Sequence, residues 1–146
     1  MNALHTSDIP SFTPVLDLQV QRKLFGDSPV LGPLELRLQT GEIVSLLGPS
    51  GCGKEPFSAV DAFTRFALQD LLLDLARRRR IALLVVTHDI DEALYLSDRV
   101  LVIGNRPGTV RRELAVPLAY PRDRRDARLA DLRGQALEAL QAAHVI

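Results

Sequence analysis

An apolar run that leads directly into a glycine-rich loop constrains the fold of this 146-residue chain more than any other feature. Residues 43–47, IVSLL, are apolar apart from Ser45, which is typical of a parallel strand covered on both faces. The loop that follows, Gly48–Lys54, reads GPSGCGK and satisfies the G-x-x-x-x-G-K pattern. A strand followed by such a loop predicts an α/β domain in which successive backbone N–H groups turn toward a polyphosphate.

The residue after this loop departs from the pattern. Glu55 directly follows Lys54, at the position where the pattern has Ser or Thr. A carboxylate beside a polyphosphate adds electrostatic repulsion. In addition, Pro56 disfavours helical geometry at Glu55, so the helix that should begin near the lysine starts several residues late. We therefore expect a weakened affinity for nucleotide.

Strand-like and helix-like patterns alternate along the chain, which predicts an α/β fold with a mostly parallel sheet. It would have an N-terminal antiparallel β part and a C-terminal helix. We expect residues 1–13 to form a flexible leader and residues 14–146 to form a single domain. Strands are expected at residues 15–20, 34–38, 43–47, 81–86 and 100–103, with a further short strand near 110–114. Helices are expected at residues 61–79, after residue 89 through 96, and at 126–143.

Each long helix has a predicted apolar face. In the first, Asp61 is a candidate N-cap, and polar residues oppose an apolar stripe formed by Phe63, Ala67, Leu71 and Leu75. The polar side comprises Arg65, Gln69, Asp70 and Asp74. In the last helix the predicted apolar face comprises Leu129, Leu132, Ala136, Leu137 and Leu140.

Composition narrows the functional classes. The chain has 18 basic and 18 acidic residues, a balance that argues against a nucleic-acid partner. Cys52 is the single cysteine, so an intrachain disulfide is impossible, and a reduced cytosolic setting fits. The sequence has no run of 18 apolar residues, and we expect a soluble chain or one that reaches a membrane only through partners.

Four segments carry a family resemblance: GEIVSLLGPSGCGK, EPFSAVDAFTR, VVTHDIDEALYLSDRVLVI and NRPGTV. In this order they resemble the ATP-binding subunits of ABC importers, most closely those of the nitrate, sulfonate and taurine type, over roughly residues 15–140. The resemblance implies a truncated P-loop NTPase that takes ATP and Mg²⁺. It also implies a cytoplasmic location at the inner face of the membrane, with permease subunits and a second ATP-binding subunit as partners.

The resemblance also implies roles for individual residues. Phe25 matches the aromatic residue that stacks on adenine, although an aromatic at a strand edge is also a common core residue. Glu55 matches the catalytic carboxylate, His88 the switch histidine that contacts the γ-phosphate, and Ser58 to Asp61 the loop at the dimer interface. The phosphate loop comprises Gly48, Pro49, Ser50, Gly51, Cys52, Gly53 and Lys54.

Between Lys54 and Glu55 the resemblance implies a large missing segment. That segment would contain the magnesium-binding hydroxyl, the glutamine loop, the helical subdomain, the LSGGQ signature and the strand that ends in the magnesium-associated aspartate. We therefore assign no metal ligand in this chain. Loss of that strand should leave an apolar sheet edge exposed, which predicts self-association.

Two functions remain open. One is an ATP-binding importer subunit that is impaired or inactive in hydrolysis. The other is a non-catalytic remnant, either a shortened gene product or a sequence joined across a gap. A compact P-loop kinase is disfavoured, because it needs Ser or Thr after Lys54.

Overall fold

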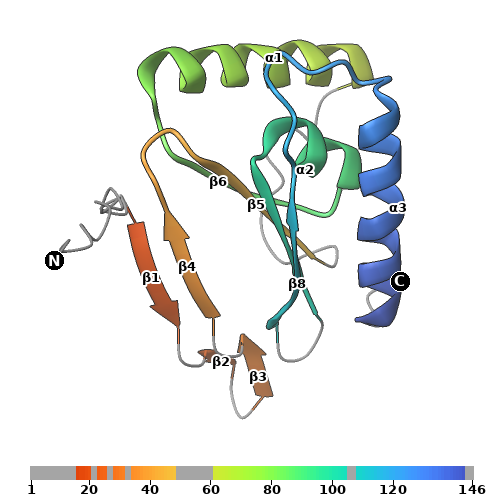
Figure 1. The fold of residues 1–146 in the computed structure, drawn as a ribbon. Coiled ribbons are helices and arrows are strands. Elements are labelled where there is room, and N and C mark those ends of the chain that lie inside the picture. The colour runs from red at the N-terminus through yellow and green to blue at the C-terminus, as the bar shows by residue number, and fades with distance from the viewer. Residues whose placement is uncertain are drawn as a thin grey trace, which may run out of the picture.

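The computed structural model describes residues 16–20, 23–25, 28–31, 34–48, 61–104 and 108–143. Strands and helices alternate in its second half, as Figure 1 shows. The elements in chain order are β1 (Leu16–Val20), β2 (Lys23–Phe25), β3 (Ser28–Leu31), β4 (Leu34–Leu38), β5 (Ile43–Leu47), α1 (Ala62–Arg79), β6 (Leu83–Thr87), α2 (Ile90–Leu96), β7 (Arg99–Ile103), β8 (Val110–Ala115) and α3 (Ala127–Ala142).

The main sheet has four strands in the order β6-β5-β7-β8. β5 runs parallel to both β6 and β7, whereas β8 pairs antiparallel with β7. The N-terminal part forms two antiparallel pairs, β1 with β4 and β2 with β3. This confirms the predicted α/β class, the mostly parallel sheet and the antiparallel N-terminal part.

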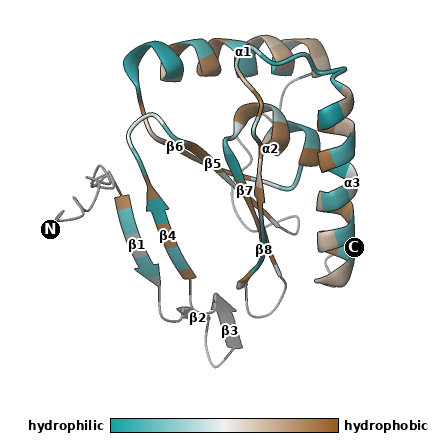
Figure 2. Cartoon of the chain, viewed as in Figure 1, coloured by the Kyte–Doolittle hydropathy of each residue, from teal (hydrophilic) through white to brown (hydrophobic). Residues whose placement is uncertain are grey.

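Apolar residues concentrate on the central strands, as the brown colouring in Figure 2 shows. In β5 the side chains of Ile43, Val44 and Leu47 are fully buried, as expected for a strand covered on both faces. β4 alternates instead, and its three leucines turn inward while Glu35 and Arg37 are exposed. The β4 leucines pack with Val44, Leu101 and Ile103, so the N-terminal β part joins the core of the main sheet.

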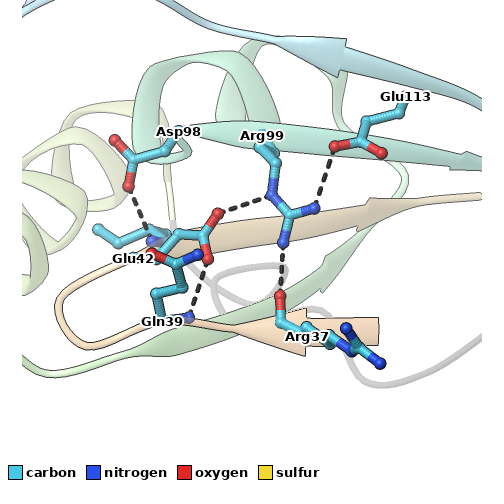
Figure 3. Close-up of polar contacts among 7 residues, drawn as sticks. Arg37, Gln39, Glu42, Asp98, Arg99 and Glu113 are labelled. Atoms are coloured by element: carbon cyan, nitrogen blue, oxygen red, sulfur yellow. Dashed lines mark hydrogen bonds and ion pairs between the residues drawn. The ribbon is translucent and has the colours of Figure 1, made fainter. Parts of the chain in front are cut away.

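A polar cluster holds the amino-terminal end of β5 (Figure 3). Arg99 in β7 donates to Glu42 Oε1 (2.6 Å), to Glu113 Oε1 in β8 (3.0 Å) and to the Arg37 carbonyl in β4 (2.6 Å). Asp98 Oδ2 accepts a hydrogen bond from the Ile43 N–H at 2.9 Å. One guanidinium therefore connects three strands and the turn that precedes β5.

The predicted apolar face of α1 is wrong, although its bounds and its N-cap are confirmed. The exposed fractions of Phe63, Leu71 and Leu75 are 86%, 64% and 46%, whereas Gln69, Leu73 and Ala76 are buried. A four-residue spacing drifts by about 40° at each step around an α-helix, so the predicted stripe winds around α1 and does not mark one face. The buried face packs on β5, β6 and α2 through a cluster of Ile43, Leu73, Ala76, Val85, Tyr95 and Leu96.

The C-terminal helix α3 largely follows the prediction. Leu129, Ala136 and Leu140 are buried and Leu132 is partly buried against the largest core cluster. Leu137 is 37% exposed, which corrects its assignment to the buried face. The buried residue that the prediction omitted is Ala139, which lies three residues after Ala136 on the same helical face.

Arg122 ties the segment after β8 to α2. Its buried guanidinium donates hydrogen bonds to the carbonyls of Leu94 (2.8 Å) and Ser97 (2.7 Å), at and just beyond the end of α2. Further bonds reach the carbonyls of Tyr95, Val116 and Leu118. Burial lowers the pKa of Arg122 because the charged form loses solvation there.

Candidate functional site

The carboxyl ends of β5 and β6 bring two parts of the predicted site together. Leu47, the last residue of β5, lies opposite Thr87, the last residue of β6. The Gly48 N–H then donates to the Thr87 carbonyl at 3.2 Å. The start of the phosphate-loop sequence and the segment carrying His88 therefore lie side by side, although 40 residues separate Gly48 from His88 in the sequence.

Local hydrogen bonds set the backbone around His88. Thr87 Oγ1 accepts from the Asp89 N–H (3.0 Å), and Asp89 Oδ1 accepts from the Glu92 N–H (3.2 Å) as the N-cap of α2. These two bonds make a short turn between β6 and α2. The turn presents His88 at the surface, where its side chain is exposed.

Asp61 lies at the start of α1 and has a capping role. Its Oδ1 accepts from the Thr64 N–H at 3.0 Å, and its Oδ2 accepts from the Thr64 hydroxyl at 2.8 Å. The backbone bond from Thr64, followed by the hydroxyl bond, lowers the pKa of the Asp61 carboxyl. One turn later, Arg65 pairs with Asp89 at 3.6 Å, which places the start of α1 next to the start of α2.

Much of the predicted site falls on residues 49–60, outside the described residues. These are Pro49, Ser50, Gly51, Cys52, Gly53, Lys54, Glu55 and Ser58. Phe25 lies in β2, and its side chain is also outside the description. Of the predicted site residues, the described part of the structure therefore brings together Gly48 and His88, with Asp61 linked to them through Arg65 and Asp89.

A buried polar network behind His88 was missed in the sequence. Gln69 in α1 donates to Glu92 Oε2 in α2 at 2.8 Å, and Arg124 donates to Gln69 Oε1 at 2.8 Å. The Arg124 guanidinium lies over the rings of Phe66 and Tyr95, at 4.0 and 3.7 Å from their centroids. Gln69, Leu73 and Ala76 are spaced at i, i+4 and i+7 and therefore share one face of α1. This spacing is the sequence signal that could have predicted the burial of Gln69.

This network supports the site without entering it. Glu92 lies in the first turn of α2, so its bond to Gln69 holds the helix whose N-cap follows His88. In the described part of the chain, no three His, Cys, Asp or Glu residues gather closely enough to hold a metal ion. None of the described helices is long and apolar enough to cross a membrane.

Relatives with assigned functions resemble this chain over most of its length. A protein of Pseudomonas syringae pv. syringae, described as "Aliphatic sulfonates import ATP-binding protein SsuB 1", is 38% identical over 233 residues, covering 90% of this chain and 98% of the relative. A "SsuB 2" protein of Pseudomonas syringae pv. tomato is 38% identical over 232 residues, with 90% and 100% covered. No family model matches the chain.

A third relative matches over a shorter stretch with higher identity. This "SsuB 1" protein of Pseudomonas aeruginosa is 64% identical over 92 residues, which cover 63% of this chain and 37% of the relative.

The parallel strands that end side by side at Gly48 and Thr87, together with these matches, define an ATP-binding protein of the ABC transporter class. Within that class, the chain belongs to the family of importer ATP-binding subunits that includes the aliphatic sulfonates import ATP-binding proteins. The expected resemblance to the nitrate, sulfonate and taurine type is thereby confirmed.

Proposed function

We propose that this chain is an ATP-binding subunit of an importer for aliphatic sulfonates, impaired in ATP hydrolysis. The observation that carries the proposal is the contact between Gly48 and Thr87 at the carboxyl ends of β5 and β6. A loop that starts at this place, at the end of a buried parallel strand, can turn its backbone N–H groups toward phosphates. In this proposal His88, which is exposed on the adjacent turn, would contact the outermost phosphate.

The phosphate contacts fall to the residues that follow Gly48. Gly51 and Gly53 give the loop its backbone freedom, and Lys54 supplies a positive charge for the outer phosphates. Phe25 would stack on adenine. When bound, Mg²⁺ neutralises the outer phosphate oxygens and orients them for attack by water.

The proposed impairment follows from the residues on the carboxyl side of Lys54. Glu55 stands where a hydroxyl ligand to magnesium belongs, and its carboxylate repels the phosphates unless a cation bridges them. Pro56 disfavours a helix at this position, and the described helix α1 begins only at Ala62. The phosphates would therefore lack the helix N-terminus that normally faces them.

We further propose the partners of a family member: permease subunits, a second ATP-binding subunit and a position at the inner face of the cell membrane. Ser58 and Asp61 would contribute to the contact between the two ATP-binding subunits. The Asp61 carboxyl already caps α1, so its part in that contact would be made through the backbone or its remaining lone pairs.

ATP binding by the purified chain tests the proposal. With Mg²⁺ present, we expect weak but measurable ATP binding with a dissociation constant of about 1 mM. Lys54→Ala should weaken it further because the loop loses its cation. His88→Ala should reduce any residual hydrolysis more than it reduces binding. Arg128→Ala, on α3, is the matched control. A folded chain that binds no ATP, or one in which Lys54→Ala changes nothing, would contradict the proposal.

A non-catalytic remnant is the second candidate, favoured by the lengths of the alignments. The match over 233 residues uses 90% of this 146-residue chain, about 131 residues, so roughly 100 positions of the relative have no counterpart here. The match over 92 residues equals in length the segment from Glu55 to Ile146. Sequencing the source gene across codons 54 and 55 decides this question, because additional coding sequence there would mean that a longer protein is made.

A further inference from the structure

β6 forms one edge of the described sheet. It pairs with β5 on one side, and among the described strands none pairs with its other side. Its sequence, LLVVT, contains no charged residue and no proline. Edge strands of natural sheets usually carry such residues because they prevent pairing with another chain. β6 is therefore open to addition of a strand.

The hydrogen bonds to β5 identify the backbone groups at the open edge. The Leu83 N–H donates to the Glu42 carbonyl (3.0 Å), and the Thr87 carbonyl accepts from the Gly48 N–H (3.2 Å). Backbone groups of alternate residues in a strand point to opposite neighbours, so Leu84 and Val86 direct theirs to the open edge. The Leu84 side chain is also 37% exposed.

The two ends of β6 carry opposite charges. Arg79 and Arg80 are exposed just before the strand, at the end of α1. Beyond its other end lie Asp89 and Asp91, whose side chains are 37% and 65% exposed and form ion pairs with Arg65 (3.6 Å) and Arg133 (3.5 Å) of the same chain. A second β6 placed antiparallel would bring the basic end of each strand to the acidic end of the other. A parallel arrangement would place like charges together, which is unfavourable.

The geometry points to a second copy of this chain as the partner of β6. The two β6 strands pair antiparallel around a two-fold axis, with Leu84 opposite Val86 of the second copy. This register brings the end of each β6 that follows Arg80 to the end that precedes Asp89 in the second copy. The same surface meets itself, so the assembly closes as a dimer. The two four-stranded sheets become one continuous sheet across the interface.

A matched pair of lysine substitutions tests this interface. Leu84 in β6 and Val110 in β8 are 37% and 36% exposed, and they lie on opposite edges of the sheet. In sedimentation velocity over a concentration series, we expect a dimer for the wild type and for Val110→Lys. Leu84→Lys should weaken dimerisation by about tenfold or more, because it places a charge within the new strand pair. If the wild type aggregates, the same comparison is made on the soluble fraction of each variant.

A second variant separates edge pairing from a loss of folding. Val86→Pro removes an outward N–H while leaving the bonds of Leu83 and Thr87 to β5 in place, and proline is tolerated at a sheet edge. It should give a monomer with wild-type circular dichroism. A monomeric wild type, or a dimer that survives both Leu84→Lys and Val86→Pro, would overturn the proposal. The proposal would also be overturned if Leu71→Lys on α1 abolished the dimer and Leu84→Lys did not, because the interface would then lie on α1.

Discussion

The two edges of the main sheet differ in chemistry. β8 has the sequence VRRELA, and its Arg111, Arg112 and Glu113 are exposed. Its pairing with β7 also shifts register between Val102 and Ile103. β6 has only apolar residues and a threonine. Charges and irregular pairing are the usual features of a protected edge, whereas an apolar run is typical of an internal strand. β6 thus has the composition of a strand with neighbours on both sides.

Among the substitutions near the protected edge at β8, the largest loss of stability is expected when Arg122 is replaced. Arg122→Met should lower the free energy of unfolding by about 3–5 kcal/mol, because buried carbonyls after β8 and at the end of α2 lose their donor. Chemical denaturation measures the change. Arg125→Ala is the control, since the Arg125 side chain is 91% exposed and its substitution should leave the midpoint unchanged. An Arg122 variant as stable as the wild type would show that the packing of α2 against the segment after β8 does not depend on the hydrogen bonds of Arg122.

A smaller effect is expected from Arg99, which joins the protected edge to the interior. Arg99→Met should cost about 1–3 kcal/mol, because Glu42 loses a charged partner in a half-buried position. Glu113→Gln removes only the more exposed arm of the same cluster and should cost less. Thermal unfolding of both variants ranks them. If Arg99→Met and Glu113→Gln lower the stability equally, the bond from Arg99 to Glu42 contributes little. The β6 and β8 edges would then differ only in surface charge.

The smallest effect is expected at Asp61, on the helix that leads to the unprotected edge. Asp61→Ala should fray the first turn of α1, whereas Asp61→Asn should retain the cap through its amide oxygen. Because the folded-state pKa of Asp61 lies below its ordinary value of 3.8, its stabilisation is present above that pH and is lost as the pH falls through the folded-state pKa. Acid titration of helical ellipticity should therefore show a smaller loss for Asp61→Asn than for the wild type. Identical acid titrations of these two proteins would exclude this contribution.

Patterns confined to single elements predicted much of this fold. The alternation in β4, the apolar run of β5 and the cap at Asp61 all lie where local sequence placed them. β6 begins at Leu83, two residues later than expected. The predicted apolar stripe of α1 failed, because its four-residue spacing winds around the helix while the buried residues lie on another face. Gln69 is buried since Glu92 and Arg124 satisfy its amide.

For the candidate site too, some features could be predicted from the sequence and others required the structure. The order of motifs along the chain indicated the family, and relatives in Pseudomonas confirm it. The contact of Gly48 with Thr87 required the pairing of β5 with β6, which no local sequence pattern contains. The roles of Lys54, Glu55 and Ser58 remain predictions, because these residues lie outside the described part of the chain.

By itself, the sequence determined the family, the strand and helix types and the unusual junction between Lys54 and Glu55, because these depend on residues that are neighbours in the chain. Only the tertiary structure decided that Gly48 and His88 lie together at the carboxyl ends of neighbouring strands, that Gln69 is buried, and that β6 lies at an edge of the described sheet without the charges that protect β8. Each of these depends on which distant segments pack together. Burial and pairing are collective properties of the fold, and local sequence patterns specify them only in part.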